Sequence, residues 1–141
     1  MSDQKRAMIP AFSAAWANAL RIAVNDDAAY RDAASGWTNP VALVVESGVE
    51  LTSGAAVQLD LVAGSCLSAE SLAPEQVTAP YVLSAALAIW KEVISGRADP
   101  LTAVARGTVI LTRGSLFTLM LHARGARALL ASAQRIETLW P

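Results

Sequence analysis

The sequence has few of the side chains that catalytic and metal sites require. Its 141 residues include one cysteine, Cys66, and one histidine, His122. A lone cysteine excludes an internal disulfide, and one cysteine with one histidine cannot supply the nitrogen and sulfur ligands of the usual zinc sites. The acidic residues also lack the spacing of a calcium loop. The sequence therefore predicts no metal and no cofactor, and it predicts that Cys66 is a buried, unreactive thiol.

Long apolar runs are missing as well. Apolar residues make up 54% of the chain, but 29 of them are alanine, which buries little area per residue. The longest runs of large apolar residues, within residues 41–45 and 109–111, are far shorter than the roughly 20 residues that cross a bilayer. The amino-terminal segment MSDQKRAMIPAF lacks the apolar stretch of a secretory signal. We therefore expect one cytoplasmic domain over residues 1–141, with at most peripheral membrane contact.

A strong net charge of either sign is absent. The formal net charge is −1 at pH 7, and the sequence has no basic patches interleaved with aromatic residues, which are typical of nucleic-acid binders. We therefore expect no nucleic-acid partner. In the second half of the chain, Arg106, Arg113, Arg124 and Arg127 could approach one another and bind an anionic group, or they could form an ordinary solvated face.

Hydrophobic periodicity predicts an α+β domain, with an antiparallel sheet covered on one face by helices. Helices are predicted over residues 9–24, over residues 25–36, between Ser84 and Gly96, over residues 99–107, and from Ser115 onward with a break at Gly125. Strands are predicted over residues 41–46, 55–64, 66–70, 81–84 and 108–113.

No constellation of catalytic residues emerges. His122 lies inside the last predicted helix, next to Leu121 and Ala123, where a structural or partly exposed role is commoner than a catalytic one. Asp26 and Asp27 are explained by the start of a helix, where acids stabilise the positive end of the helix dipole. The sequence therefore predicts a binding protein rather than an enzyme, with a carboxylate-based activity left open.

Large apolar side chains from three predicted helices in the second half could face one space. They are Trp90, Val93, Ile94, Leu101, Val104, Leu116, Leu119 and Met120. Such a set at helical spacing forms either a packed core or the wall of a ligand pocket with few polar groups. Periodicity does not separate these two interpretations.

The segment IWKEVISGRADPLTAVARGTVILTRG, residues 89–114, carries a resemblance to a known family. It contains a tryptophan in a helix, a Gly-x-x-Asp-Pro motif, a short helix, a glycine, an apolar strand and another glycine. The residues are Trp90, Gly96, Asp99, Pro100, Gly107 and Gly114. Their order and spacing resemble the sterol carrier protein 2 family of lipid-binding domains. The chain departs from the family at Ala79-Pro80-Tyr81, where an acidic residue often opens the fourth strand.

The resemblance implies a five-stranded, largely antiparallel sheet covered on one face by helices, with an apolar tunnel between the layers. It implies non-catalytic binding or transfer of a hydrophobic ligand: a fatty acid, an acyl-CoA, a sterol-like molecule or an isoprenoid lipid. The eight apolar residues named above would line the tunnel, and the last helix would be its lid. The alternative is a homodimerisation or interaction module, or an accessory subunit of a lipid-modifying enzyme, whose cavity is filled by its own side chains.

Overall fold

Five strands form one mixed sheet in the computed structural model, which describes residues 8–141. They are β2 (Val41–Val45), β3 (Ala55–Val62), β4 (Ser65–Leu72), β5 (Tyr81–Ala85) and β6 (Ile110–Arg113). Their order in the sheet is β4-β3-β2-β5-β6. Neighbouring strands are antiparallel except β2 and β5, which are parallel. The predicted α+β class with a five-stranded, largely antiparallel sheet is therefore confirmed.

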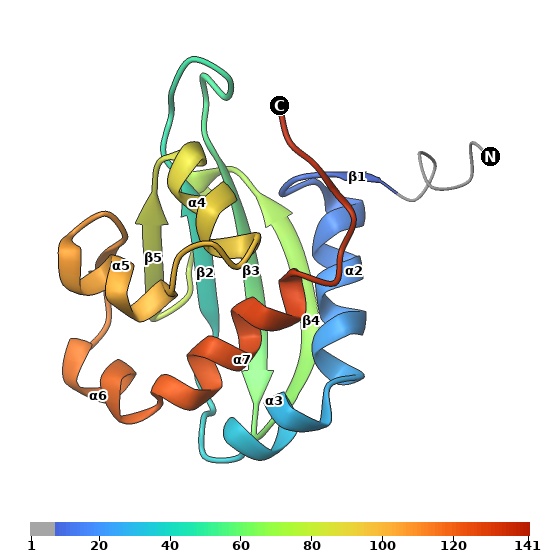
Figure 1. The fold of residues 1–141 in the computed structure, drawn as a ribbon, viewed down its shortest axis with the longest axis vertical. Coiled ribbons are helices and arrows are strands. Elements are labelled where there is room, and N and C mark those ends of the chain that lie inside the picture. Colours follow the sequence, from blue (N-terminus) through green and yellow to red (C-terminus); the bar gives the residue numbers. More distant parts are fainter. Residues whose placement is uncertain (1–7) are drawn as a thin grey trace.

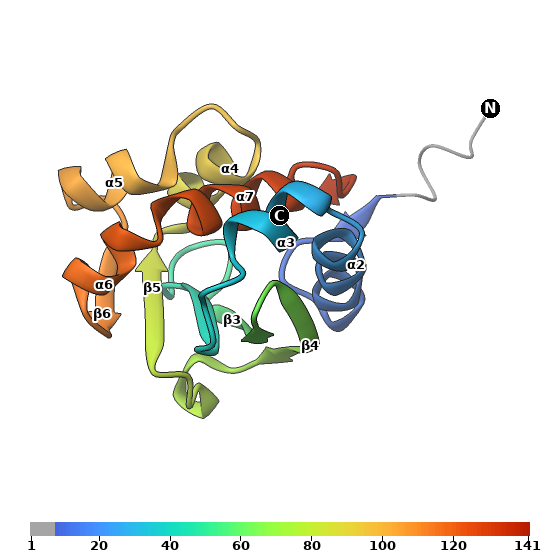
Figure 2. The same ribbon diagram turned by 90° about the horizontal axis from the view of Figure 1, so that it is seen from below.

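Helices cover one face of this sheet (Figures 1 and 2). The helices are α2 (Ala14–Asn25), α3 (Ala28–Ala33), α4 (Leu87–Ile94), α5 (Pro100–Arg106), α6 (Leu116–Leu121) and α7 (Ala123–Ala133). Helix α7 crosses the strands and packs against α2, α3, α4 and α5, while α2 packs along the edge strand β4. On the opposite face, Val77 and Ala79 of the β4–β5 connection pack against a small apolar cluster from the sheet.

The main core fills the layer between the sheet and the helices. Trp16, Trp90 and Tyr30 are its largest fully buried side chains. The Trp90 indole N–H donates to the Val44 carbonyl oxygen across 2.7 Å, which joins α4 to the middle of the sheet. An unpaired indole donor in such a place would cost about 1–3 kcal/mol.

The predicted helix over residues 9–24 begins later than expected. Its N-cap is Ser13, whose hydroxyl oxygen accepts from the Trp16 backbone N–H across 3.1 Å. Upstream of this cap, β1 (Ile9–Pro10) pairs in parallel with β7 (Thr138–Leu139). The sequence analysis predicts neither of these strands, because each is two residues long and its partner lies at the other end of the chain.

The predicted helix over residues 25–36 is shorter at both ends. Its N-cap is Asp27, whose Oδ1 accepts from the Ala29 backbone N–H across 3.0 Å. The side-chain amide of Asn25 pairs instead with the backbone of Cys66, donating from Nδ2 across 2.9 Å and accepting at Oδ1 across 2.8 Å. Asn25 is therefore used to hold α2 to β4 and is not available as the helix cap.

Two other predicted helix boundaries are wrong. Ser84 lies inside β5, where it pairs with Val44 and is buried, so it does not cap α4. The N-cap of α4 is Ala86, which makes no side-chain capping bond. The last predicted helix breaks at His122, whose backbone angles are φ −108° and ψ 30°, and not at Gly125, which lies inside α7.

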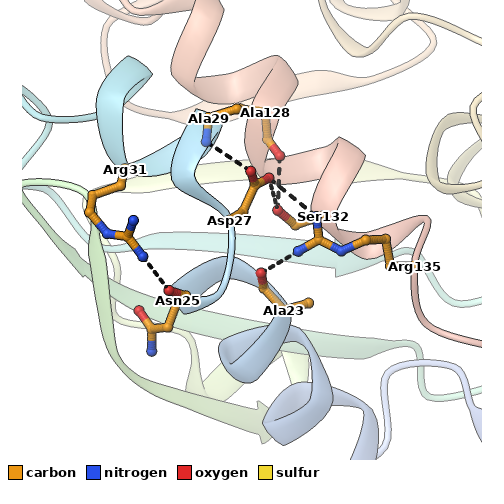
Figure 3. A network of polar contacts seen from close by, with 8 residues as sticks. All are labelled: Ala23, Asn25, Asp27, Ala29, Arg31, Ala128, Ser132 and Arg135. Carbon is orange, nitrogen blue, oxygen red and sulfur yellow. Dashed lines mark hydrogen bonds and ion pairs between the residues drawn. The ribbon is translucent and has the colours of Figure 1, made fainter.

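A polar network fixes the carboxyl-terminal half of α7 to the α2–α3 junction (Figure 3). Ser132 is fully buried, and its hydroxyl donates to Asp27 Oδ2 across 2.9 Å. Arg135 lies 3.6 Å from the same carboxylate and donates to the Ala23 carbonyl oxygen. Burial raises the pKa of Asp27, but the hydrogen bonds from Ser132 and from two backbone amides outweigh it and lower the pKa overall. The carboxylate is thus ionised at neutral pH and joins three helices.

The Gly-x-x-Asp-Pro corner has the conformation that the sequence predicts. Asp99 is the N-cap of α5 and accepts from the Thr102 backbone N–H across 2.9 Å, Pro100 is the first helical residue, and Gly107 ends the helix with φ 79°. Asp99 also accepts from Arg127 Nε of α7 across 2.9 Å. The hydrogen bond from Arg127, opposed by desolvation, holds the pKa of Asp99 at about 2.

Replacement of Asp99 by alanine should lower the free energy of unfolding by about 1 kcal/mol at pH 7, because α5 loses its cap. The pKa of Asp99 lies below its unfolded value of 3.8, so its contribution is present above pH 4 and is lost as the pH falls toward 2. Thermal unfolding of Asp99→Ala and the wild type from pH 6 to pH 2.5 should therefore show a difference that shrinks with falling pH. Asp99→Asn, which keeps a capping oxygen, should lose less stability. A difference that is independent of pH would contradict this role.

Candidate functional site

An apolar pocket lies between the sheet and the helices that cover it. Its floor comes from three neighbouring strands, through Val41 of β2, Leu61 of β3 and Leu83 of β5. Its walls come from α3, the segment after α3, α6 and α7. The wall residues are Tyr30, Ala34, Trp37, Leu119, His122, Gly125, Ala126, Leu129 and Leu130. The pocket therefore occupies the layer in which the resemblance places a tunnel.

The pocket is narrow in this structure. Its cavity volume is about 40 Å³, far below the roughly 300–1,000 Å³ that is usual for ligand pockets. A hydrocarbon chain therefore fits only when the walls move apart.

Small residues leave this space empty on the α7 side. Gly125 is buried inside α7, and a β-carbon built on it would lie 3.4 Å from the Ala34 β-carbon. Ala126, the next residue of α7, also lines the pocket. Leucine side chains at these positions would occupy the hollow, because protein interiors are otherwise close-packed. The lack of side-chain volume on α7 thus creates the pocket.

Two titratable side chains lie in the otherwise apolar wall. Tyr30 is 1% exposed, and burial, with a smaller contribution from Cys66, raises the pKa of its hydroxyl to about 12. The His122 imidazole is half-buried and meets the Trp37 ring edge-on, with the ring centroids 5.2 Å apart. Both side chains line the pocket, so each can offer a polar atom to a ligand.

Trp37 is held rigidly at the side of the pocket. Its indole N–H donates to the Asn39 carbonyl oxygen across 2.7 Å. Its ring also makes an edge-on contact with Tyr81, at a centroid distance of 4.8 Å. The indole thus presents a fixed apolar surface, and its polar atom is already satisfied.

Leu119 is the one residue of the eight predicted to line a tunnel that lies in the wall of this pocket. Trp90, Val93 and Ile94 of α4 are at most 2% exposed and belong to the main core. Val93 also borders an open hollow between α4, α5 and α7, and Leu130 borders both this hollow and the pocket. Leu130 thus lies between the pocket and the hollow that Val93 borders.

The other four predicted lining residues lie on α5 and α6. Leu101 is buried, and Val104 is half-buried against the main core. Leu116 and Met120 are 50% and 39% exposed, whereas Leu119 of the same helix points inward. A contact of these residues with a ligand stays a prediction.

Most of the wall could not be anticipated from the sequence. The apolar pattern does not single out Tyr30 or Trp37, and it places His122 only as a residue inside the last predicted helix. Trp37 lies beyond the end of α3 and packs against His122 at the break between α6 and α7. No local pattern could pair these two residues, which are far apart in the sequence.

The arginines of the second half do not form one anion site. Arg127 pairs with Asp99, and Arg124 lies 3.4 Å from Asp32 of α3. Arg113 donates to the Ala79 carbonyl oxygen across 2.9 Å. The cluster that the sequence analysis considers is therefore dispersed over several partners.

Three further observations concern the reactivity of Cys66, metal binding and membrane-spanning helices. Burial raises the pKa of the Cys66 thiol to about 11, which agrees with the predicted inert cysteine. In the part of the chain that the structure describes, no three His, Cys, Asp or Glu side chains are grouped as metal ligands. Over residues 8–141, none of the helices has both the length and the apolar character needed to traverse a bilayer. The cytoplasmic location stays a prediction.

The fold and the pocket define an α+β domain with an apolar hollow beneath its covering helices. A crystal structure of sterol carrier protein 2 matches it with a TM-score of 0.86 and 37% sequence identity, over 89% of this chain and 98% of that chain. A solution structure of a conserved hypothetical protein from Thermus thermophilus matches with a TM-score of 0.84 and 36% identity, over 91% of this chain and 90% of that one. The chain therefore belongs to the sterol carrier protein 2 family, as the segment 89–114 predicts.

A more distant structure shares the fold alone. Sterol carrier protein 2 from Yarrowia lipolytica matches with a TM-score of 0.56 and 13% identity, over 84% of this chain and 88% of that chain. Comparison with protein-family models and with curated protein sequences gives no match. The family assignment thus depends on the two structures above 30% identity.

The close approach of α7 to α3 can be tested at Gly125. Gly125→Ala should be tolerated and should stabilise the protein by up to about 1 kcal/mol, because its β-carbon meets Ala34 at ordinary contact distance and alanine favours a helix. Gly125→Leu should destabilise it by about 1–3 kcal/mol through overpacking. Urea unfolding of the two variants measures the difference, and an equally stable Gly125→Leu would contradict the observed packing.

Proposed function

We propose that the protein is a non-catalytic carrier that binds a hydrophobic molecule in the apolar pocket. The ligand class is a fatty acid, an acyl-CoA, or a sterol-like or isoprenoid lipid. The observation that carries this proposal is the pocket wall, in which only Tyr30 and His122 bear titratable side chains. Membership of the sterol carrier protein 2 family supports it, since the relative at 37% identity is by its name a sterol carrier.

Hydrocarbon burial supplies the binding energy without any catalytic group. Each buried methylene contributes about 0.8 kcal/mol, so ten of them contribute about 8 kcal/mol, which corresponds to a micromolar dissociation constant. Association and the opening of the walls reduce this value. Apolar walls discriminate weakly between chains of similar shape, so the pocket is suited to a class of lipids.

The ligand lies with its polar end at His122 in this proposal. The imidazole is half-buried, whereas the Tyr30 hydroxyl is protonated and lies among apolar side chains. A carboxylate or hydroxyl group at the end of a lipid can therefore meet the imidazole while the chain extends over the Val41, Leu61 and Leu83 floor.

A longer chain reaches the residues that the sequence analysis predicts. Leu130 separates the pocket from the hollow that Val93 borders. When a ligand displaces the Leu130 side chain, the two spaces join, and Val93 and its neighbours on α4 become part of the wall. Leu119 contacts the ligand from the start. This arrangement assigns the predicted lining residues of α4, together with Leu119, to an expanded site.

The narrowness of the pocket favours a second candidate function. A cavity volume of only about 40 Å³ is compatible with a filled cavity, as in an interaction module or an accessory subunit of a lipid-modifying enzyme. Light scattering over a range of protein concentrations separates the two functions. A homodimer that does not bind added lipid would support the interaction module, and a monomer that binds lipid would support the carrier.

Native mass spectrometry of the protein purified from cells should detect a bound lipid. Uptake of a fluorescent fatty acid should be saturable, with a dissociation constant in the micromolar range. Thioester cleavage of an acyl-CoA in the same preparation should stay at the rate of the buffer. The carrier proposal fails if no lipid is present and no saturable uptake occurs.

Ala126→Leu should weaken fatty-acid uptake at least about tenfold, because three added carbons occupy the space left for the ligand. Ala15→Leu is the matched control, since Ala15 is also a helical alanine, in α2, but is exposed and lines neither the pocket nor the hollow beside Val93. Fluorescent fatty-acid titration measures both variants, and circular dichroism checks their folding. Equal affinities of the two variants would place the ligand elsewhere.

A further inference from the structure

Helix α6 turns its more apolar side outward. At 3.6 residues per turn, Leu116, Phe117, Met120 and Leu121 fall within about 140° of its circumference, and all four are exposed. Leu119 lies outside this arc, is 5% exposed and lines the pocket. We call the four exposed residues the α6 patch. A helix that only packed on the core would expose polar side chains at these positions.

The exposed apolar side chains of the α6 patch are clustered, whereas most others are scattered singly over the surface. Eleven large apolar side chains are exposed within residues 8–141, and four of them belong to this six-residue helix. Phe117 is 74% exposed, whereas none of the other seven aromatic residues, all of which the structure describes, belongs to the exposed class. Single exposed apolar residues need no explanation, but contiguous ones mark interaction sites.

The chain around the patch carries positive charge only. Residues 100–136 contain five arginines and no acidic residue. Arg127 and Arg135 are paired with acids from outside this segment, and Arg124 makes only an exposed pair, which contributes little. Arg106 and Arg113 form no ion pair in the described part of the chain. The segment therefore keeps a net positive charge.

Two of these arginines lie near the α6 patch in the fold or in the sequence. Arg106 is the last residue of α5, which lies at the same end of the molecule as α6 in both views of the fold (Figures 1 and 2). Arg124 follows α6 by three residues, and its side chain is 77% exposed. An exposed apolar patch with arginines nearby has the composition of a helix that lies in a membrane interface.

We propose that the α6 patch, with Arg106 and Arg124, is the surface by which the protein contacts a lipid bilayer that contains anionic headgroups. Phe117 and Leu121 enter the boundary between headgroups and acyl chains, and the arginines lie among the phosphates. The contact is peripheral, since α6 is only six residues long. In this orientation, α6 lies against the membrane, and Leu119 of the same helix lines the pocket.

Charge argues for a membrane rather than a second copy of the chain. A symmetric dimer through α6 would bring the same surface of both copies together, so that Arg106 and Arg124 of one copy would lie near those of the other. Like charges at an interface oppose association. Anionic headgroups neutralise the same arginines.

Co-sedimentation with vesicles tests this surface without any added ligand, so its outcome is independent of the carrier proposal. Vesicles of phosphatidylcholine with 30% phosphatidylglycerol should bind the wild type more tightly than vesicles of phosphatidylcholine alone, and 0.5 M salt should weaken this binding. Phe117→Ser/Leu121→Ser should reduce it at least about tenfold. Arg106→Gln/Arg124→Gln should remove the preference for phosphatidylglycerol.

The matched control is Val49→Ser/Leu67→Ser, which removes two exposed apolar side chains elsewhere and should bind like the wild type. Circular dichroism should show that all variants are folded, because every substituted residue is exposed. The proposal is overturned if Phe117→Ser/Leu121→Ser binds as the wild type does, or if the wild type binds neither kind of vesicle. It is also overturned if light scattering shows a wild-type dimer that this double variant dissociates.

Discussion

One carboxylate sets the positions of the two helices that enclose the pocket. Asp27 Oδ1 caps α3, and Oδ2 accepts from the buried Ser132 hydroxyl of α7. Both oxygens are therefore satisfied, which a buried or half-buried carboxylate requires. Because α3 and α7 meet at this contact, the distance between them is fixed there, and the space farther along α7 depends on the side chains that lie between the helices. The pocket exists because those side chains are Gly125, Ala126 and Ala34.

The two ends of α7 are constrained to different degrees. The carboxyl-terminal half carries Ser132 and is followed by Arg135, which donates to the Ala23 carbonyl oxygen (Figure 3). In the described part of the chain, the amino-terminal half forms two exposed ion pairs, Arg124 with Asp32 and Arg127 with Asp99, but no buried polar contact like that of Ser132, and His122 at its start makes no side-chain capping bond. We therefore expect α7 to move away from the sheet at its amino-terminal end, with Asp27 and Ser132 as the fixed point. This end borders the pocket, so a modest motion there widens the space that a lipid needs.

The sequence predicts the sheet, the Gly-x-x-Asp-Pro corner and the family, because strands and turns depend on local patterns. The alternating pattern in β3 and the cap at Asp99 are examples. The pocket is less predictable, since Tyr30, Trp37 and His122 come together only through the packing of α3 on α7. Apolar periodicity predicts that Leu116, Leu119 and Met120 share a helix, yet Leu119 points inward and the other two outward. Errors at helix ends arise where another partner uses the expected cap, as Cys66 does for Asn25.

The position of α6 connects the pocket to the surface of the molecule. Moving a lipid from a bilayer into water costs about 0.8 kcal/mol for each methylene that becomes exposed. A route along apolar side chains avoids this cost, which favours transfer to a carrier. In the described part of the chain, α6 is the pocket-lining helix whose outward side is also apolar. Its six residues end at the break before α7, and His122 at this break belongs to the pocket wall. A shift of α6 on a membrane would therefore act directly on the less constrained end of α7, which is the end that must move for the pocket to open.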